Sequence, residues 1–196
     1  HSITLRRNLR VKMLKENEYS VDGTPVDCVV LATQKILQSA PDLVISGINA
    51  GQNMGEDVLY SGTVAAALEA SLFGYKAIAV SINSYQGQNF ATAASWMARL
   101  LELGIDGLIP ERGILNVNFP NVEQDEIKGI RLTNTGHRRY YNFITVIEEL
   151  EDGFIYKIGG DLPEWEIQKG TDAEAVAENY ISITPLGITL THGEAF

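Results

Sequence analysis

The sequence predicts an α/β protein with a Rossmann-like, doubly wound parallel sheet, followed by a β-rich arm. Up to about residue 120, short apolar runs bounded by glycine or proline alternate with segments of strong helix formers. Beyond that point, segments with strand-like alternation and turn residues dominate. Strands and helices that alternate at these lengths form right-handed βαβ units. We therefore expect an α/β core over residues 1–120 and a β-rich arm, with a hairpin and a return strand, over residues 121–196.

The first helix has a clear start signal. Thr24 suits the N-cap, Pro25 suits the first helical position, and Asp27 completes a capping box, so the helix is expected to run to about Gln38. Before it, the alternation of polar and apolar residues over 8–20 predicts a strand.

Three apolar runs predict buried strands of the sheet, because parallel strands covered on both faces are apolar throughout or nearly so. Glycine ends each of the two helices expected between them, since it tolerates the left-handed conformation found there. The strands are expected at 43–45, 77–81 and 114–119, and the helices at 63–74 and 90–103.

The arm is predicted from turn and strand signals after Pro120. Residues 127–133 and 180–184 have the composition of strands, and 145–158 is expected to fold at Asp152-Gly153 into a hairpin. A short helix should begin at Thr171, with Glu174 three residues later as a second capping box.

The composition of the chain argues against two classes of partner, nucleic acids and membranes. The net charge of −10 argues against a protein that binds nucleic-acid backbones, which need a concentrated positive surface. A local cluster of backbone N–H groups can still bind a small anion. No stretch approaches the ~20 apolar residues of a membrane span, so we expect a cytoplasmic protein without a membrane partner. The lone Cys28 is expected to be a small buried hydrophobe.

The most informative segment is residues 46–63, SGINAGQNMGEDVLYSGT, between a predicted strand and a predicted helix. Ligands of open parallel sheets bind beyond the carboxyl ends of the strands, where this loop begins. Asn49 and Asn53 offer amide groups for a cation or a phosphate, and Ser61-Gly62-Thr63 places hydroxyl and N–H groups at a helix N-terminus. This pattern predicts an anion site, although the same residues could simply turn the chain and cap the helix.

Common catalytic signatures are absent from the sequence: there is no P-loop, G-x-G-x-x-G, zinc-ligand spacing or G-x-S-x-G elbow. A serine triad is disfavoured because His1, His137 and His192 lie far from the loop in sequence. The basic, aromatic stretch 136–141 and Trp165 are expected to make subunit or packing contacts rather than to bind nucleic acid.

The loop closely resembles that of the stationary-phase survival protein family, SurE, whose pattern is S-G-x-N-x-G-x-N-x-G-x-D-x-x-x-S-G-T. Residues 46–63 match every defined position. Four further segments are similar to the family: HSIT at 1–4, GTPVDCV at 23–29, NVNFP at 116–120, and GTD at 170–172 together with YISITPL at 180–186.

The resemblance implies a phosphatase, dependent on Mg²⁺ or Mn²⁺, that hydrolyses nucleoside 5′- and 3′-monophosphates, with short polyphosphate as a further substrate of some members. It implies Asn49 as a metal ligand and Asn53, Ser61, Gly62 and Thr63 as the phosphate site. It also implies a homodimer or tetramer built through the C-terminal arm.

One departure from the family is important. Members begin with a strand that ends in Asn-Asp-Asp-Gly, and that catalytic aspartate pair is expected upstream of His1, together with the first βα unit. The chain starts on His1 rather than Met, so we expect it to be incomplete. If no upstream segment exists, the alternative is a non-catalytic phosphate- or nucleotide-binding α/β module.

Overall fold

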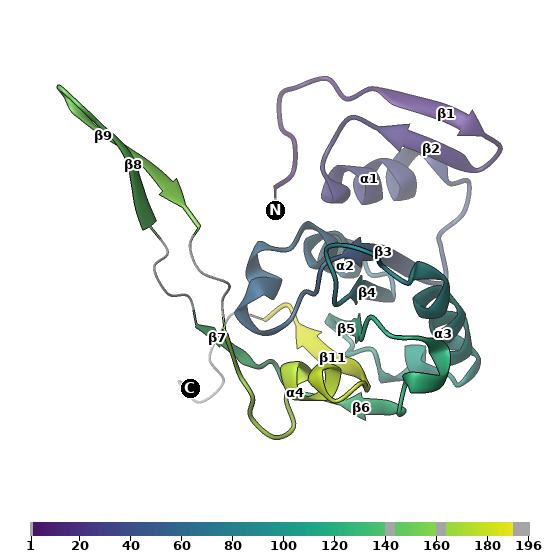
Figure 1. Cartoon of the computed structure of the whole chain (residues 1–196). Helices are drawn as coiled ribbons and strands as arrows, with labels where there is room; N and C mark the ends of the chain where they lie inside the picture. The colour runs from purple at the N-terminus through teal and green to yellow at the C-terminus, as the bar shows by residue number, and fades with distance from the viewer. Residues whose placement is uncertain (1, 140–143, 160–163, 190–196) are drawn as a thin grey trace, which may run out of the picture.

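A five-stranded sheet forms the centre of the computed structural model, which describes residues 2–139, 144–159 and 164–189. Its strand order is β3–β4–β5–β11–β6 (Figure 1). The first three strands are parallel, β11 runs antiparallel to β5, and β6 is parallel to β11. The predicted α/β class with a mostly parallel sheet is confirmed. The strands are β3 (Val44–Ala50), β4 (Ala77–Ile82), β5 (Gly113–Phe119), β6 (Ile130–Leu132) and β11 (Ile181–Gly187).

Two helices cover the opposite faces of the sheet. Residues alternate in direction along a strand, so β4 presents Ile78 and Val80 to the face covered by α3 (Phe90–Glu102). Its smaller Ala77 and Ala79 face α2 (Gly62–Leu72), which lies close to the sheet through alanines of its own. Both helices were expected, and α2 begins one residue earlier than predicted.

The N-terminal region departs from the prediction in two ways. Residues 8–20 form a hairpin rather than one strand, with β1 (Val11–Lys15) and β2 (Glu18–Val21) joined at Asn17, whose φ of 57° suits a tight turn. Cys28 is exposed rather than buried, because it lies on the side of α1 (Pro25–Leu31) that does not pack on the core. The helix continues as a π-helical turn, Ala32–Ile36, close to the predicted end.

The capping box predicted for α1 is present. The Thr24 side chain accepts from the Asp27 N–H, and Asp27 Oδ2 accepts from the Thr24 N–H at 2.8 Å. Asp27 also accepts from the N–H and hydroxyl of Thr4, at 2.8 and 2.6 Å. Burial alone would raise the pKa of Asp27, but these hydrogen bonds outweigh it and hold the pKa at about 2. The carboxylate thus ties the N-terminal segment to α1.

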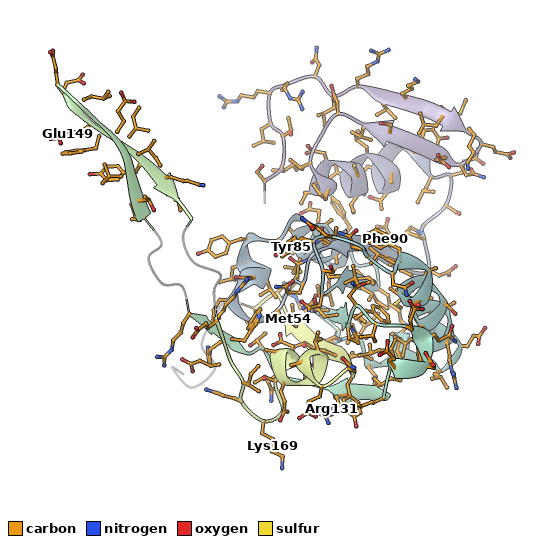
Figure 2. The ribbon with its side chains drawn as sticks, viewed as in Figure 1. Met54, Tyr85, Phe90, Arg131, Glu149 and Lys169 are labelled. Atoms are coloured by element: carbon orange, nitrogen blue, oxygen red, sulfur yellow. The ribbon has the colours of Figure 1, made fainter. Side chains whose placement is uncertain are left out.

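The region beyond residue 120 divides between the sheet and a projecting hairpin. Strands β6 and β11 join the central sheet, which therefore takes strands from both sides of residue 120. The hairpin of β8 (Ile144–Leu150) and β9 (Gly153–Ile158) extends away from the body, and Glu149 lies near its tip (Figures 1 and 2). At its base, β7 (His137–Arg139) pairs with β10 (Glu164–Glu166). The remaining helical segments are α4 (Asp172–Ala177) and the 3-10 turns Gly55–Tyr60, Ile105–Leu108 and Gln124–Glu126.

Of the predicted arm, Tyr140, Tyr141 and the C-terminal residues 190–196 lie outside the described residues. Within the described part of the chain, no helix combines the length and apolar character that crossing a membrane requires.

Candidate functional site

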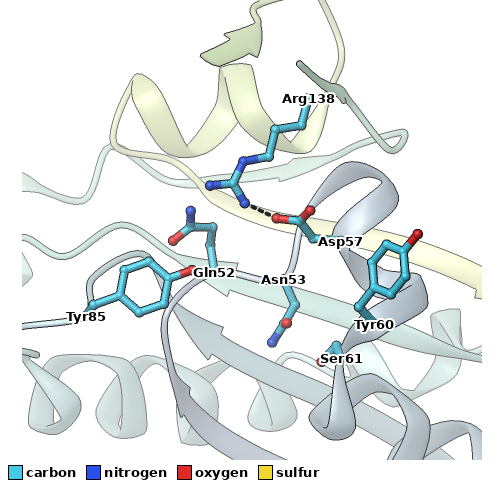
Figure 3. Close-up of a pocket in the computed structure, with 7 residues that line it drawn as sticks. All are labelled: Gln52, Asn53, Asp57, Tyr60, Ser61, Tyr85 and Arg138. Carbon is cyan, nitrogen blue, oxygen red and sulfur yellow. Dashed lines mark hydrogen bonds and ion pairs between the residues drawn. The ribbon is translucent and has the colours of Figure 1, made fainter. Parts of the chain in front are cut away.

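The segment 46–63 lies at the carboxyl edge of the parallel strands, as predicted, but its first five residues belong to β3, which was predicted to end at residue 45. It leaves β3 after Ala50, passes through the 3-10 turn Gly55–Tyr60 and enters α2 at Gly62. Beside it is a cavity of about 710 Å³ (Figure 3). The cavity is lined by Gln52, Asn53, Asp57, Tyr60, Ser61, Tyr85 and Arg138.

Asn53 is held in the cavity wall by the side chains of the neighbouring strands. Its backbone N–H donates to Asn118 Oδ1 at 2.9 Å, and its carbonyl accepts from the amides of Asn118 and Asn116 at 3.0 and 2.8 Å. Its own side-chain amide donates to Ser81 Oγ at 2.7 Å. Asn53 is only 7% exposed, so these bonds fix the loop in one position over the sheet.

The residues that hold Asn53 belong to a buried polar strip. Asn116 and Asn118 alternate along β5 and so share one face of the sheet, where register places Ser81 opposite Asn118. The strip continues onto β11, where Ser182 lies opposite Asn118 and hydrogen-bonds Thr133 at 2.8 Å. The sequence reasoning predicted β5 but not this role. The available signal was a pair of asparagines inside an otherwise apolar buried strand.

Ser61 caps α2 and faces the cavity. Its Oγ accepts from the Val64 N–H at 3.1 Å, so the N-cap prediction is confirmed. Gly62 and Thr63 form the first helical turn behind it, where free N–H groups and the helix dipole favour an anion. Of the four predicted phosphate residues, Asn53 and Ser61 line this cavity; Gly62 and Thr63 are not among the lining residues.

Asn49, the predicted metal ligand, lies at the end of β3 and is also not among the cavity-lining residues. Its amide nitrogen donates to the Gly51 carbonyl at 2.8 Å and to the Ala50 carbonyl at 3.3 Å. This leaves the amide oxygen, a suitable ligand atom for Mg²⁺ or Mn²⁺, directed away from both carbonyls. Among the described residues, no group of three or more His, Cys, Asp or Glu side chains could hold a metal ion. The role of Asn49 as a metal ligand therefore stays a prediction, for which the described residues provide no acidic cluster as partner.

Arg138 brings a cation into the cavity from the base of the arm. Its guanidinium pairs with Asp57, and both side chains are largely buried, with 10% and 16% exposure. The guanidinium also lies over the Trp165 ring, 4.9 Å from its centroid. Sequence reasoning assigned this basic stretch to a subunit contact and missed its place beside the loop. The positive charge of the stretch was noted, but its position beside the loop depends on a contact between residues 81 positions apart.

A second ion pair joins the same two segments. His137 Nδ1 lies 2.6 Å from Glu56 Oε1, while Glu56 Oε2 accepts from the Arg138 N–H at 3.1 Å. The hydrogen bond to His137 lowers the pKa of Glu56, and the same bond raises the pKa of His137. Glu56 thus binds the strand β7 by both a side chain and the backbone.

Asp172 connects the loop, the arm and α4 from the interior. Its Oδ2 accepts from the Gly55 N–H at 2.9 Å, and its Oδ1 accepts from the N–H groups of Gly136 and Ala173 at 2.7 and 2.8 Å. The residue is fully buried, and burial raises the pKa of its carboxyl although these hydrogen bonds oppose the shift. This junction was not foreseen, although Asp172 was noted as part of a family segment.

An α/β fold with a polar loop and a cavity at the carboxyl edge of its sheet defines a doubly wound protein with its ligand cavity where open parallel sheets place theirs. Sequence and structure comparisons identify its family. The family model described as survival protein SurE matches residues 1–142, and this chain belongs to that family.

Two individual proteins illustrate the relationship. The chain is 46% identical to 5′-nucleotidase SurE of Pseudomonas fluorescens (strain SBW25), over all of this chain and 78% of the relative. It also matches the crystal structure of the SurE protein from Aquifex aeolicus with a TM-score of 0.85 and 36% identity, covering all of this chain and 80% of that one. The resemblance stated from the loop residues is thereby confirmed.

Proposed function

We propose that this protein is a divalent-metal-dependent phosphomonoesterase that hydrolyses nucleoside 5′- and 3′-monophosphates, with short polyphosphate as a further substrate. The observation that carries the proposal is the cavity beside loop 46–63, where Asn53 and Ser61 meet the N-terminus of α2. The name of the Pseudomonas relative, a 5′-nucleotidase, supports the same reaction.

The phosphate would bind at the start of α2. Ser61 offers a hydroxyl, and the Gly62 and Thr63 N–H groups lie at the positive end of the helix dipole. Asn53 would donate its second amide hydrogen, since the first is directed to Ser81. Arg138 also lines the cavity, where Asp57 balances its charge, so the positive potential for the phosphate would come from the start of α2 and the proposed metal.

We propose Mg²⁺ or Mn²⁺ as the metal, with the Asn49 oxygen as one ligand. The other ligands in this proposal are the aspartate pair that the family pattern places upstream of His1. When bound, such an ion neutralises phosphate charge and lowers the pKa of a bound water that can act as the nucleophile. The contribution of the described residues is to hold the phosphate and to fix the loop that carries Asn49.

The proposed partners are a nucleoside monophosphate and further copies of the chain, with no nucleic acid and no membrane. The β8–β9 hairpin supports a homodimer or tetramer, because β8 is exposed throughout and β9 at every residue except Gly153. A two-stranded hairpin is marginally stable alone, so a second copy is the natural cover for it. Its apolar residues that are more than 50% exposed are Ile144, Val146, Ile147, Phe154, Tyr156 and Ile158.

The test is hydrolysis of AMP, 3′-AMP and tripolyphosphate by the complete protein, with and without chelator. We expect chelation to abolish turnover and added Mn²⁺ or Mg²⁺ to restore it. Asn49→Ala should lower kcat by about 100-fold or more with little change in melting temperature, because it removes a metal ligand from the loop. Asn8→Ala, which changes an exposed asparagine outside the loop, is the matched control.

Two outcomes would contradict parts of this proposal. Turnover that survives complete removal of metal would exclude metal dependence. AMP binding without hydrolysis by the complete protein would instead favour a non-catalytic nucleotide-binding module.

A further inference from the structure

Tyr85 lies on the opposite side of the cavity from Tyr60, in the segment that follows β4 (Figure 3). Tyr85 is 66% exposed and Tyr60 is 79% exposed, so both rings of the cavity are open to a ligand. Neither the phosphate site nor the proposed metal ligand uses Tyr85. Its position at the rim, together with an exposed aromatic face, indicates a role in binding the part of the substrate that extends from the phosphate.

The ring of Tyr85 is held by contact with the loop backbone. A Cβ atom at Gly51 would lie 2.2 Å from Tyr85 Cε1 and 2.8 Å from two further ring carbons, so the ring lies directly against the Gly51 backbone. Gly51 is itself fixed, because its N–H donates to the Ile82 carbonyl at 3.0 Å. One side of the aromatic ring is therefore supported, and the ring is pre-organised for contact on its exposed side.

The chemistry around the ring suits a nucleobase. Aromatic faces stack on bases of any identity, since every base has a π-face. The neighbouring Gln52 offers an amide donor and an amide acceptor, which can meet the polar edge of either a purine or a pyrimidine. The cavity of about 710 Å³ lies within the size range of small-molecule sites.

We propose that Tyr85 is the stacking platform for the nucleobase, with Gln52 at the base edge. The inference rests on the proposed function, because it assigns the base subsite of the same cavity. Tyr85 would contribute to substrate binding, and the residues around the phosphate would carry out the chemical step.

The test compares AMP with ribose 5-phosphate, which carries the same sugar and phosphate without a base. In the complete protein, Tyr85→Ala should raise KM for AMP by about 10-fold and leave kcat, and both constants for ribose 5-phosphate, within about twofold. Tyr85→Phe keeps the aromatic face and should behave like the wild type. Tyr19→Ala, at a partly exposed tyrosine of the β1–β2 hairpin, is the control.

Equal rises in KM for AMP and ribose 5-phosphate in Tyr85→Ala would overturn the inference. A rise in KM for AMP alone that occurs in Tyr60→Ala but not in Tyr85→Ala would overturn it as well. Calorimetric binding of both ligands separates this result from the proposed function. If the protein hydrolyses no phosphomonoester, the proposed function is wrong. The stacking role of Tyr85 would still be supported if Tyr85→Ala weakened the binding of AMP more than that of ribose 5-phosphate.

Discussion

The two strands β4 and β5 and the two strands β8 and β9 have similar apolar content but opposite surroundings. Every residue of β4 and β5 is buried, whereas β8 is exposed throughout and β9 nearly so. The central strands find all their packing partners within one chain, on α2 and α3. The hairpin finds none of comparable extent in the described residues. The apolar residues of β4 and β5 therefore stabilise the fold of one chain. We propose that those of β8 and β9 instead form contacts between copies of the chain.

The difference extends to polar residues. Inside the sheet, the Asn53 backbone bonds both polar atoms of the Asn118 side chain and the amide nitrogen of Asn116, so the core itself positions the loop. Buried polar groups with matched partners make such a loop rigid, whereas the hairpin has only its base, β7 and β10, to position it. Four predictions test whether the loop is clamped and the hairpin is independent.

The largest effect is expected from Asp172→Ala. The change leaves the buried N–H groups of Gly55, Gly136 and Ala173 without their acceptor. Each unsatisfied donor costs about 1–3 kcal/mol, so the free energy of unfolding should fall by at least about 3 kcal/mol. Denaturant unfolding measures it, with the exposed Asp125→Ala as control. A loss below about 1 kcal/mol would show that the loop is not clamped through this carboxylate.

The second prediction compares two asparagines on the same strand and face, both fully buried. Asn118→Ala removes hydrogen bonds to both the N–H and the carbonyl of Asn53 and should cost about 2 kcal/mol. Asn116→Ala removes only one, and Asn116 Oδ1 has no partner among the described residues, so its loss should cost less. Unfolding and AMP turnover of the two variants provide the comparison. Equal or reversed costs would contradict this account of the loop.

The third prediction concerns the hairpin. Phe154→Lys places a charge on an exposed strand, so the unfolding free energy of the body should change by less than about 0.5 kcal/mol. If the hairpin forms the proposed interface, sedimentation should show a smaller assembly than that of the wild type. Glu149→Gln, near the hairpin tip, is the control. An unchanged assembly would remove the hairpin from the proposed interface, and a large loss of stability would contradict its independence.

Much of the fold could be predicted because its signals are local. The Thr24 capping box, the Ser61 N-cap and the 145–158 hairpin each depend on residues within a few positions, and all are present. The β1–β2 hairpin was missed because the turn at Asn17 has no glycine or proline to mark it. The cytoplasmic location stays a prediction.

The site was predicted less completely, because its supports come from distant parts of the sequence. Asp172 reaches Gly55 across 117 positions, and Arg138 reaches Asp57 across 81. Hydrophobic periodicity and helix caps depend on residues close together in the sequence, so they cannot predict such distant pairs. Only the folded topology brings these residues together. Loop chemistry alone could therefore indicate Asn53 and Ser61, but not what holds the loop in place.

The smallest effect is expected from the exposed pair of Glu56 and His137, which joins the loop to the base of the arm. The His137 pKa is raised above its ordinary 6.5, so its stabilisation is complete below pH 6.5 and is lost as pH rises through the raised value. The Glu56 pKa is lowered from its ordinary 4.5, so its stabilisation is present above pH 4.5 and is lost as pH falls through the lowered value. His137→Ala should therefore reduce thermal stability most between pH 4.5 and 6.5, and progressively less at higher pH. Melting curves from pH 4 to 9 measure the difference. A variant whose deficit stays constant across that range would show that the loop and the arm are not joined by this ion pair.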